Sequence, residues 1–181
     1  MVNIVTIENQ RYLVDVAFGA DGPSRPLPLI HGHESPGIFP QLYRLTYTLL
    51  PRHTDNSQRT WVYSYGQSDG PWTDAYSFTE VEFFPADYEV MNLSTMTTPQ
   101  SFFVQVVLCV KTLLNEESKD AEGVLTLFQN EVKRRIGGTK EVVETLRSET
   151  DRVRALEKWF GIVLTEEERR GIVGLVTELK G

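Results

Sequence analysis

Three sets of residues in this chain are of types that could do chemistry. In His31-Gly32-His33-Glu34, two histidines two residues apart would point the same way on a strand and could bind a metal ion with the neighbouring carboxylate. Cys109, the one cysteine, could act as a nucleophile. Asp15 is a carboxylate within an apolar, strand-like stretch, and an ionised carboxylate that is removed from water needs a partner.

The surroundings of the first two candidates favour structural roles. Prolines at positions 26, 28 and 36 flank the histidine pair, so we predict a solvated loop there and no metal site. Cys109 lies within the unbroken apolar run FFVQVVLCVKTLL, whereas a catalytic thiol needs an electropositive and partly open setting, so we predict a core residue. For Asp15 two interpretations stay open: a buried acid that accepts backbone hydrogen bonds, or a catalytic acid.

Composition and charge argue against several classes of protein. The 181 residues, 40% of them hydrophobic and 24% charged, suffice for one well-packed domain or a domain with a smaller appendage. A net charge of −7 argues against nucleic acid as a partner, because nonspecific binding to it needs clustered Lys and Arg. No apolar stretch approaches the ~20 residues of a membrane span, and the first residues lack a secretory signal, so we expect no membrane partner and a cytoplasmic location.

The pattern of apolar residues predicts a β-rich body around Asp15. Two strand-like runs, 2–8 and 11–16, are separated by Asn9-Gln10, a spacing typical of a hairpin, and the second run carries Asp15. Residues 17–42 are rich in proline and glycine, which predicts a long ordered loop. Three aromatic-rich strands between residues 42 and 84 then indicate a barrel or a curled sheet.

The second half of the chain changes from strands to helices. A short helix is predicted to begin at Pro85, followed by two strands over 102–114 and 123–136. Beyond Gly137-Gly138 the apolar period becomes helical, with apolar positions that continue to residue 179. Two pairs with capping-box spacing predict helix starts: Ser148 with Asp151, and Thr165 with Glu168.

The run YLVDVAFGADGPSRPLPL resembles the arylamine N-acetyltransferase family, in which a strand carrying VDVGFG supplies the acid of a Cys-His-Asp triad. YRLTYTLL, YSFTEVEFFPADYEVMN, TTPQSFF and RALEKWFGIVLTEEE follow that family in order, and its fungal members are the most similar. The resemblance implies an α+β, cysteine-proteinase-like fold that lacks its N-terminal helical domain. Residues 1–92 would form a β-barrel-like antiparallel sheet with the ordered loop 17–42, and residues 93–181 an α/β lid with C-terminal helices.

The resemblance also assigns roles to particular residues. Asp15 matches the triad acid, and Phe18 and Gly19 match the family's Phe-Gly pair, which lines the acyl and amine pocket. Ala17 replaces the usual first glycine of that turn, which reduces the freedom of the backbone there. The residues that match the segment contacting coenzyme A are Thr97, Thr98 and Ser101.

The activity implied by the resemblance is acetyl transfer from acetyl-CoA, as co-substrate, to the nitrogen of small arylamines or arylhydrazines, a reaction of xenobiotic metabolism. The cysteine thiolate would become an acyl thioester while the histidine moves protons and the acid stabilises the imidazolium. No metal is implied. The acceptor amine, and the choice between acetyl and longer acyl groups such as malonyl, stay open.

The family's catalytic histidine would fall one position before Met1, and its cysteine further upstream, so of the triad only Asp15 is present in these 181 residues. We therefore expect an N-terminally truncated enzyme, begun at an internal methionine, and no transfer by the chain on its own. The alternative is a non-catalytic truncated paralogue that binds coenzyme A or a protein partner.

Overall fold

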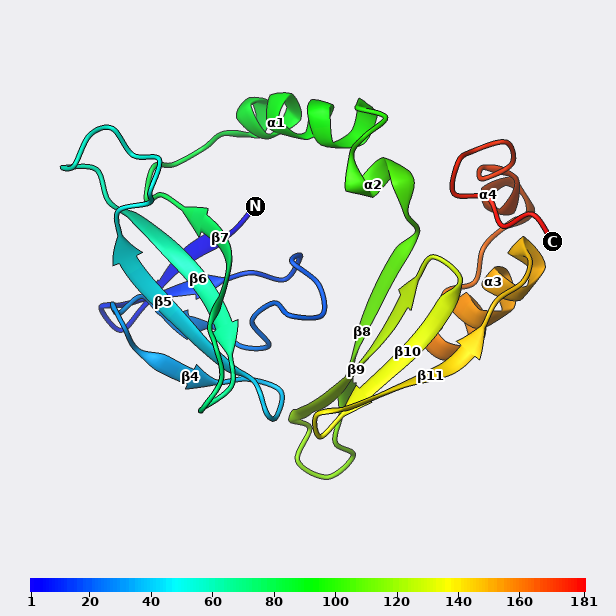
Figure 1. Ribbon diagram of the computed structural model, residues 1–181, viewed down its shortest axis with the longest axis horizontal. Coiled ribbons are helices and arrows are strands. Elements are labelled where there is room, and N and C mark those ends of the chain that lie inside the picture. Colours follow the sequence, from blue (N-terminus) through cyan, green and yellow to red (C-terminus); the bar gives the residue numbers. More distant parts are fainter. The chain divides into compact units, whose positions relative to one another are not determined.

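The computed structural model describes residues 1–181, which form two compact units, Met1–Glu82 and Phe83–Gly181. Both units contain antiparallel sheets, and all the helices belong to the second (Figure 1). The predicted α+β, antiparallel fold class is therefore confirmed, whereas the division into domains at residues 92 and 93 stays a prediction. None of the helices is both long and apolar enough to cross a membrane.

The first unit begins with a hairpin of β1 (Asn3–Ile7) and β2 (Gln10–Val14). Glu8 and Asn9 both have positive φ, 48° and 67°, as the two central residues of a tight hairpin turn require. The turn lies one residue earlier than predicted because Gln10 already pairs with Ile7. The hairpin itself is confirmed, and it fixes which side chains of β2 face inward.

A three-stranded sheet and a four-stranded sheet make up this unit. The predicted loop 17–42 contains two short strands, one in each sheet, because its backbone pairs with β2 and with β5. The first sheet has the order β1-β2-β3 and the second β4-β5-β6-β7. The remaining strands are β3 (Leu27–Pro28), β4 (Glu34–Pro36), β5 (Leu42–Thr48), β6 (Thr60–Gly66) and β7 (Thr73–Phe78).

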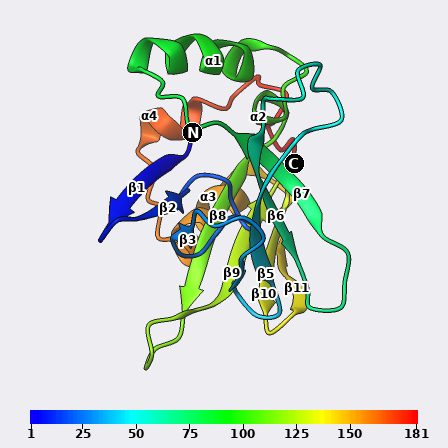
Figure 2. The same cartoon turned by 90° about the vertical axis from the view of Figure 1, so that its left-hand side faces the viewer.

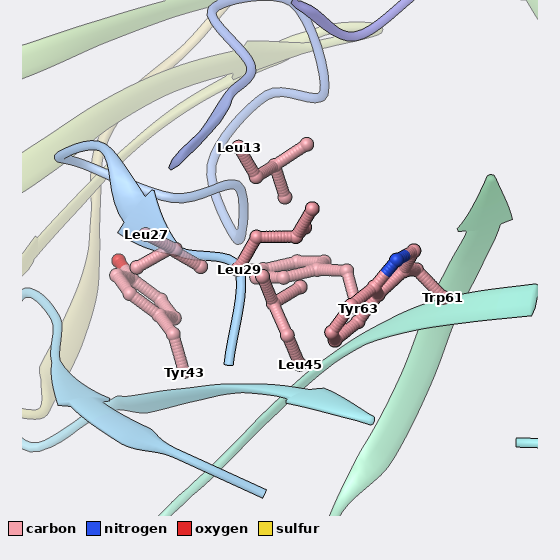
Figure 3. Close-up of a cluster of buried hydrophobic side chains, with 7 residues drawn as sticks. All are labelled: Leu13, Leu27, Leu29, Tyr43, Leu45, Trp61 and Tyr63. Atoms are coloured by element: carbon pink, nitrogen blue, oxygen red, sulfur yellow. The ribbon is translucent and has the colours of Figure 1, made fainter. Parts of the chain in front are cut away.

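The inward-facing side chains of the two sheets share one core. Alternation along β5 and β6 places aromatic and aliphatic residues on the same face, where they meet leucines from the first sheet (Figure 3). Burying this apolar area is the main stabilisation of the unit. The cluster consists of Leu13, Leu27, Leu29, Tyr43, Leu45, Trp61 and Tyr63.

We expect Gly37→Ala to destabilise this core by about 1–3 kcal/mol, the usual cost of overpacking. A Cβ at Gly37 would lie 2.3 Å from Cζ of Tyr43, whose side chain is fully buried and cannot move aside. Urea denaturation measures the loss in the free energy of unfolding. Gly70→Ala is the matched control, since the nearest atom to a Cβ there is 3.6 Å away; equal stability of the two variants would contradict the prediction.

The second unit is a four-stranded antiparallel sheet of order β11-β10-β9-β8 with short helices before and after it (Figure 1, Figure 2). Residue Pro85 stands in the first turn of α1, as predicted, although α1 continues to Thr97. The elements are α1 (Pro85–Thr97), α2 (Phe102–Gln105), β8 (Leu108–Leu114), β9 (Ala121–Phe128), β10 (Glu131–Ile136), β11 (Thr139–Thr145), α3 (Glu149–Ala155), the π-helix η1 (Leu156–Phe160) and α4 (Glu166–Arg170).

Several predicted boundaries are wrong. The strand run expected to reach residue 84 ends at Phe78, and the run 102–114 starts as a helical turn before it becomes β8. The predicted strand 123–136 is a hairpin, in which Gln129 turns the chain with a φ of 54°. Residues 139–145, where a helical period was expected to begin, form the edge strand β11, because pairing with β10 outweighs its weak apolar pattern.

The predicted helix starts are correct, whereas the last helix ends earlier than the apolar pattern up to residue 179 predicted. Ser148 caps α3 by accepting from the Asp151 N–H, and Thr165 with Glu168 forms a reciprocal capping box at α4. However, α4 ends at Arg170, so residues 171–181 form a non-helical tail.

Arg152 on α3 holds this tail. Its side chain is 3% exposed and ion-pairs with Glu149, Nη1 to Oε1 at 2.6 Å. The guanidinium also donates to the carbonyls of Thr177 and Gln129 at 3.1 and 3.3 Å, and the Leu179 N–H donates to Glu149 at 2.7 Å. Burial lowers the pKa of Arg152, and the ion pair opposes that effect. The tail is thus fixed to α3 by charge-assisted hydrogen bonds.

Candidate functional site

Asp15 directly follows β2 and is 8% exposed. It lies on the same side of the chain as the fully buried Leu13, two residues earlier, because side chains alternate along a strand. The Ala17 N–H donates to Oδ1 of Asp15 at 2.9 Å, a local bond that closes a turn and orients the carboxylate. Ala17 therefore performs a backbone function that needs no glycine.

Tyr76 on β7 lies beside Asp15. Burial, followed by the nearby Asp15 carboxylate, raises the pKa of Tyr76. Its hydroxyl is buried and makes no hydrogen bond, so it is available as a neutral donor to that carboxylate. Burial likewise raises the pKa of Tyr63, whose hydroxyl donates to the Asp21 carbonyl at 2.7 Å. The acid thus has the Tyr76 hydroxyl beside it, and the Tyr76 ring stacks on that of Tyr63.

Phe18 and Gly19 lie in the turn after Asp15. The Phe18 ring is 44% exposed and packs against Tyr76 and Tyr63, with centroids 5.1 and 6.2 Å away. Gly19 has a φ of 106°, a backbone conformation that favours glycine, and its carbonyl accepts from Gly22 at 3.1 Å. A partly exposed aromatic surface therefore lies close to a buried carboxylate, although the role of Phe18 and Gly19 in a pocket stays a prediction.

The residues assigned to coenzyme A all belong to the second unit. Thr97 is the last residue of α1, and its hydroxyl donates to the Leu93 carbonyl at 2.6 Å. Thr98 is the C-cap of α1, and its hydroxyl lies 3.3 Å from that of Ser94. Ser101 is the N-cap of α2 and makes no side-chain cap bond. These hydroxyls mark the connection between two helices, and their coenzyme A contacts stay a prediction.

The other two candidates have structural surroundings. Nδ1 of His31 accepts from the Tyr47 N–H at 2.9 Å, and no group of three or more His, Cys, Asp or Glu side chains could hold a metal ion. Cys109 on β8 is half-buried against the core of the second unit, and burial raises the pKa of its thiol. A thiol with a raised pKa is a poorer nucleophile at neutral pH.

A buried, oriented carboxylate beside a phenolic donor can hold and stabilise a cation such as an imidazolium. No local pattern marked Tyr76 and Tyr63 as members of this site, because tyrosines in strands usually belong to a core. The signal that could have found them is their place on inward-facing positions of adjacent strands, where they form a cross-strand pair.

Comparison with known proteins identifies the family. A family model described as N-acetyltransferase matches residues 1–169. The chain belongs to the arylamine N-acetyltransferase family. Among curated relatives, the N-malonyltransferase FDB2 of Fusarium pseudograminearum is 39% identical over 95% of this chain and 53% of its own length. Arylamine N-acetyltransferase 1 of Rattus norvegicus is 27% identical over 90% of this chain and 58% of its own.

Solved structures of arylamine N-acetyltransferases share the fold. The Salmonella typhimurium enzyme matches with a TM-score of 0.74 at 23% identity, over 92% of this chain and 57% of its own. The Mycobacterium marinum enzyme, solved in complex with CoA, matches with a TM-score of 0.70 at 24% identity, over 89% of this chain and 53% of its own. The chain spans about half the length of the curated relatives it matches.

Proposed function

We propose that this chain is the acid-bearing part of an N-acyltransferase that carries an acyl group from a coenzyme A thioester to the nitrogen of an aromatic amine or hydrazine. The observation that supports this most is Asp15, which stands where the family motif has its triad acid and is buried and oriented by the Ala17 N–H. A cysteine and a histidine from outside these 181 residues would complete the triad.

Malonyl-CoA is the donor that we propose as preferred, with acetyl-CoA as the second donor. The support comes from FDB2 of Fusarium pseudograminearum and of Gibberella moniliformis, both N-malonyltransferases, at 39% and 36% identity. Both donors share the coenzyme A thioester. We therefore retain Thr97, Thr98 and Ser101 as the proposed contacts of coenzyme A for either acyl group.

In the proposed mechanism, the cysteine gives its proton to the histidine, and the thiolate attacks the thioester carbonyl. A carbon–sulfur bond forms to the cysteine and the bond to coenzyme A breaks, with the leaving thiolate taking the proton from the imidazolium. The amine then attacks the new thioester, loses a proton to the histidine and leaves as an amide, which restores the cysteine thiol. Asp15 stabilises the imidazolium in both halves of the cycle.

We expect the 181-residue chain alone to show no acyl transfer above a protein-free control, because triad members act as a unit and losing one costs several orders of magnitude in rate. A chimera can join the 181-residue chain to the part of Fusarium FDB2 that comes before the region similar to this chain. This chimera should transfer malonyl groups to p-anisidine. Coenzyme A release and the amide product measure the reaction. An inactive chimera, made alongside active full-length FDB2, would favour the non-catalytic alternative.

A further inference from the structure

We propose that Arg25 determines the choice of acyl donor, by pairing with the free carboxylate of a malonyl group. This inference rests on the proposed function, since it concerns the acyl group delivered next to Asp15. A malonyl thioester differs from an acetyl thioester by one carboxylate, so selecting it requires a cation beside the acyl position. Arg25 comes two residues before β3, the strand that pairs with the end of β2.

The register between β2 and β3 brings Arg25 toward Asp15. The Leu29 N–H donates to the Arg11 carbonyl at 2.8 Å, and Leu13 pairs with Leu27. Two residues beyond this last pair along each chain come Asp15 and Arg25, both just outside the strands. The two segments diverge at this point, and the Arg25 side chain is exposed whereas Asp15 is buried. Arg25 therefore lies on the segment that enters the sheet next to the end of β2, the strand that Asp15 follows.

Both ends of the segment that carries Arg25 are anchored. On one side, the Tyr63 hydroxyl holds the Asp21 carbonyl, and Gly22 folds back against Phe18. On the other side, Leu27 is 2% exposed within the core. Only a few residues separate these anchors, so the backbone of Arg25 is confined to the neighbourhood of the aromatic surface.

Arg25 is also an available cation. Arg11 is engaged by Glu80 at 2.5 Å, and Arg44 lies over the Trp72 ring, 4.0 Å from its centroid. No hydrogen bond or ion pair holds Arg25 within its unit. A guanidinium that has no partner can bind a carboxylate bidentately, which a lysine ammonium cannot do.

The charge of Asp15 makes such a cation necessary. A malonyl carboxylate brought close to Asp15 is repelled, and the repulsion is strong where aromatic rings exclude water. A nearby guanidinium offsets it. The methyl group of an acetyl donor is uncharged, so neither the repulsion nor the guanidinium affects it. Arg25 should therefore change the rate with malonyl-CoA and not the rate with acetyl-CoA. Because Arg25 is exposed, added salt should weaken the preference for malonyl.

The test uses the chimera described above with malonyl-CoA and acetyl-CoA in parallel. Arg25→Gln should lower kcat/KM for malonyl-CoA by about 10- to 100-fold, the usual effect of a hydrogen bond to a charged group, and leave acetyl-CoA within about twofold. Arg25→Lys should retain part of the malonyl rate. Arg52→Gln, another exposed arginine of the same unit, is the control and should change neither rate.

The outcomes separate the two proposals. An active chimera whose donor preference is unchanged by Arg25→Gln overturns the role of Arg25 and leaves the proposed function intact. A chimera that transfers neither group overturns the proposed function and the Arg25 role with it.

A second measurement does not depend on turnover. Phenylglyoxal modifies free guanidinium groups, and peptide mass spectrometry follows each arginine separately. Malonyl-CoA should slow the modification of Arg25 and not that of Arg52, whereas acetyl-CoA should slow neither. Equal modification of Arg25 with both donors would contradict the assignment even if Arg25→Gln had lowered the rates by disturbing the loop.

Discussion

Asp15→Asn in the active chimera is expected to lower kcat for malonyl transfer by about 10³- to 10⁴-fold, the usual loss when a triad acid is made neutral. An asparagine fills the same space and can still accept from the Ala17 N–H, so the turn persists. It cannot stabilise an imidazolium by charge, and it offers an amide group that can hold the histidine in the wrong tautomer. Single-turnover acylation of the cysteine measures the effect directly.

The control is Asp69→Asn, which removes the same charge from an exposed turn of the first unit and should leave kcat unchanged. Thermal denaturation of both variants shows whether the fold is retained. A folded Asp15→Asn variant with more than a tenth of the original rate would mean that Asp15 is a structural acid, the other interpretation that the sequence left open.

Arg152→Met is expected to lower the free energy of unfolding of the second unit by about 3 kcal/mol, because removing one partner of a buried ion pair leaves the other unpaired. The substitution leaves the Glu149 carboxylate without its cation and the Thr177 carbonyl without its donors. Hydrogen exchange is the most specific measurement, since the Leu179 amide bonded to Glu149 should lose its protection.

Arg154→Met is the matched control on the same helix. Arg154 pairs with Asp151 through a side chain that is 70% exposed, and exposed pairs contribute little to stability. We expect a change within about 0.5 kcal/mol and an unaltered tail. Equal protection of the Leu179 amide in both variants would show that the tail is held by packing and not by Arg152.

The features of the fold that depend on neighbouring residues could be predicted from the sequence, whereas those that depend on contacts between distant residues could not. The β1–β2 hairpin and the capped starts of α3 and α4 follow from neighbouring residues, and they were predicted correctly. The edge strand β11 and the end of α4 depend on contacts with residues distant in sequence, and they were predicted wrongly. The four-residue α2 is too short to show a period of its own.

The candidate site divides in the same way. Asp15 stood out because a charge inside an apolar run is a local anomaly, and the motif around it drew attention to Phe18 and Gly19. Tyr76 lies in the other sheet, more than 60 residues along the chain, and meets Asp15 where the two sheets pack, which no local pattern records. Arg25 was one exposed arginine among several until the register of β2 and β3 related it to Asp15.

The two-residue turn at Glu8 and Asn9 has a consequence for the burial of the charge. Successive strand residues face opposite ways. Whether Asp15 faces the core therefore depends on which residues of β1 and β2 pair, because a shift of this pairing by one residue would reverse the side that Asp15 faces. One residue inserted into this turn would keep the motif around Asp15 unchanged in sequence. If β2 shifted its register by one to absorb the insertion, the carboxylate would turn into water and Val14 or Val16 would take its place inside.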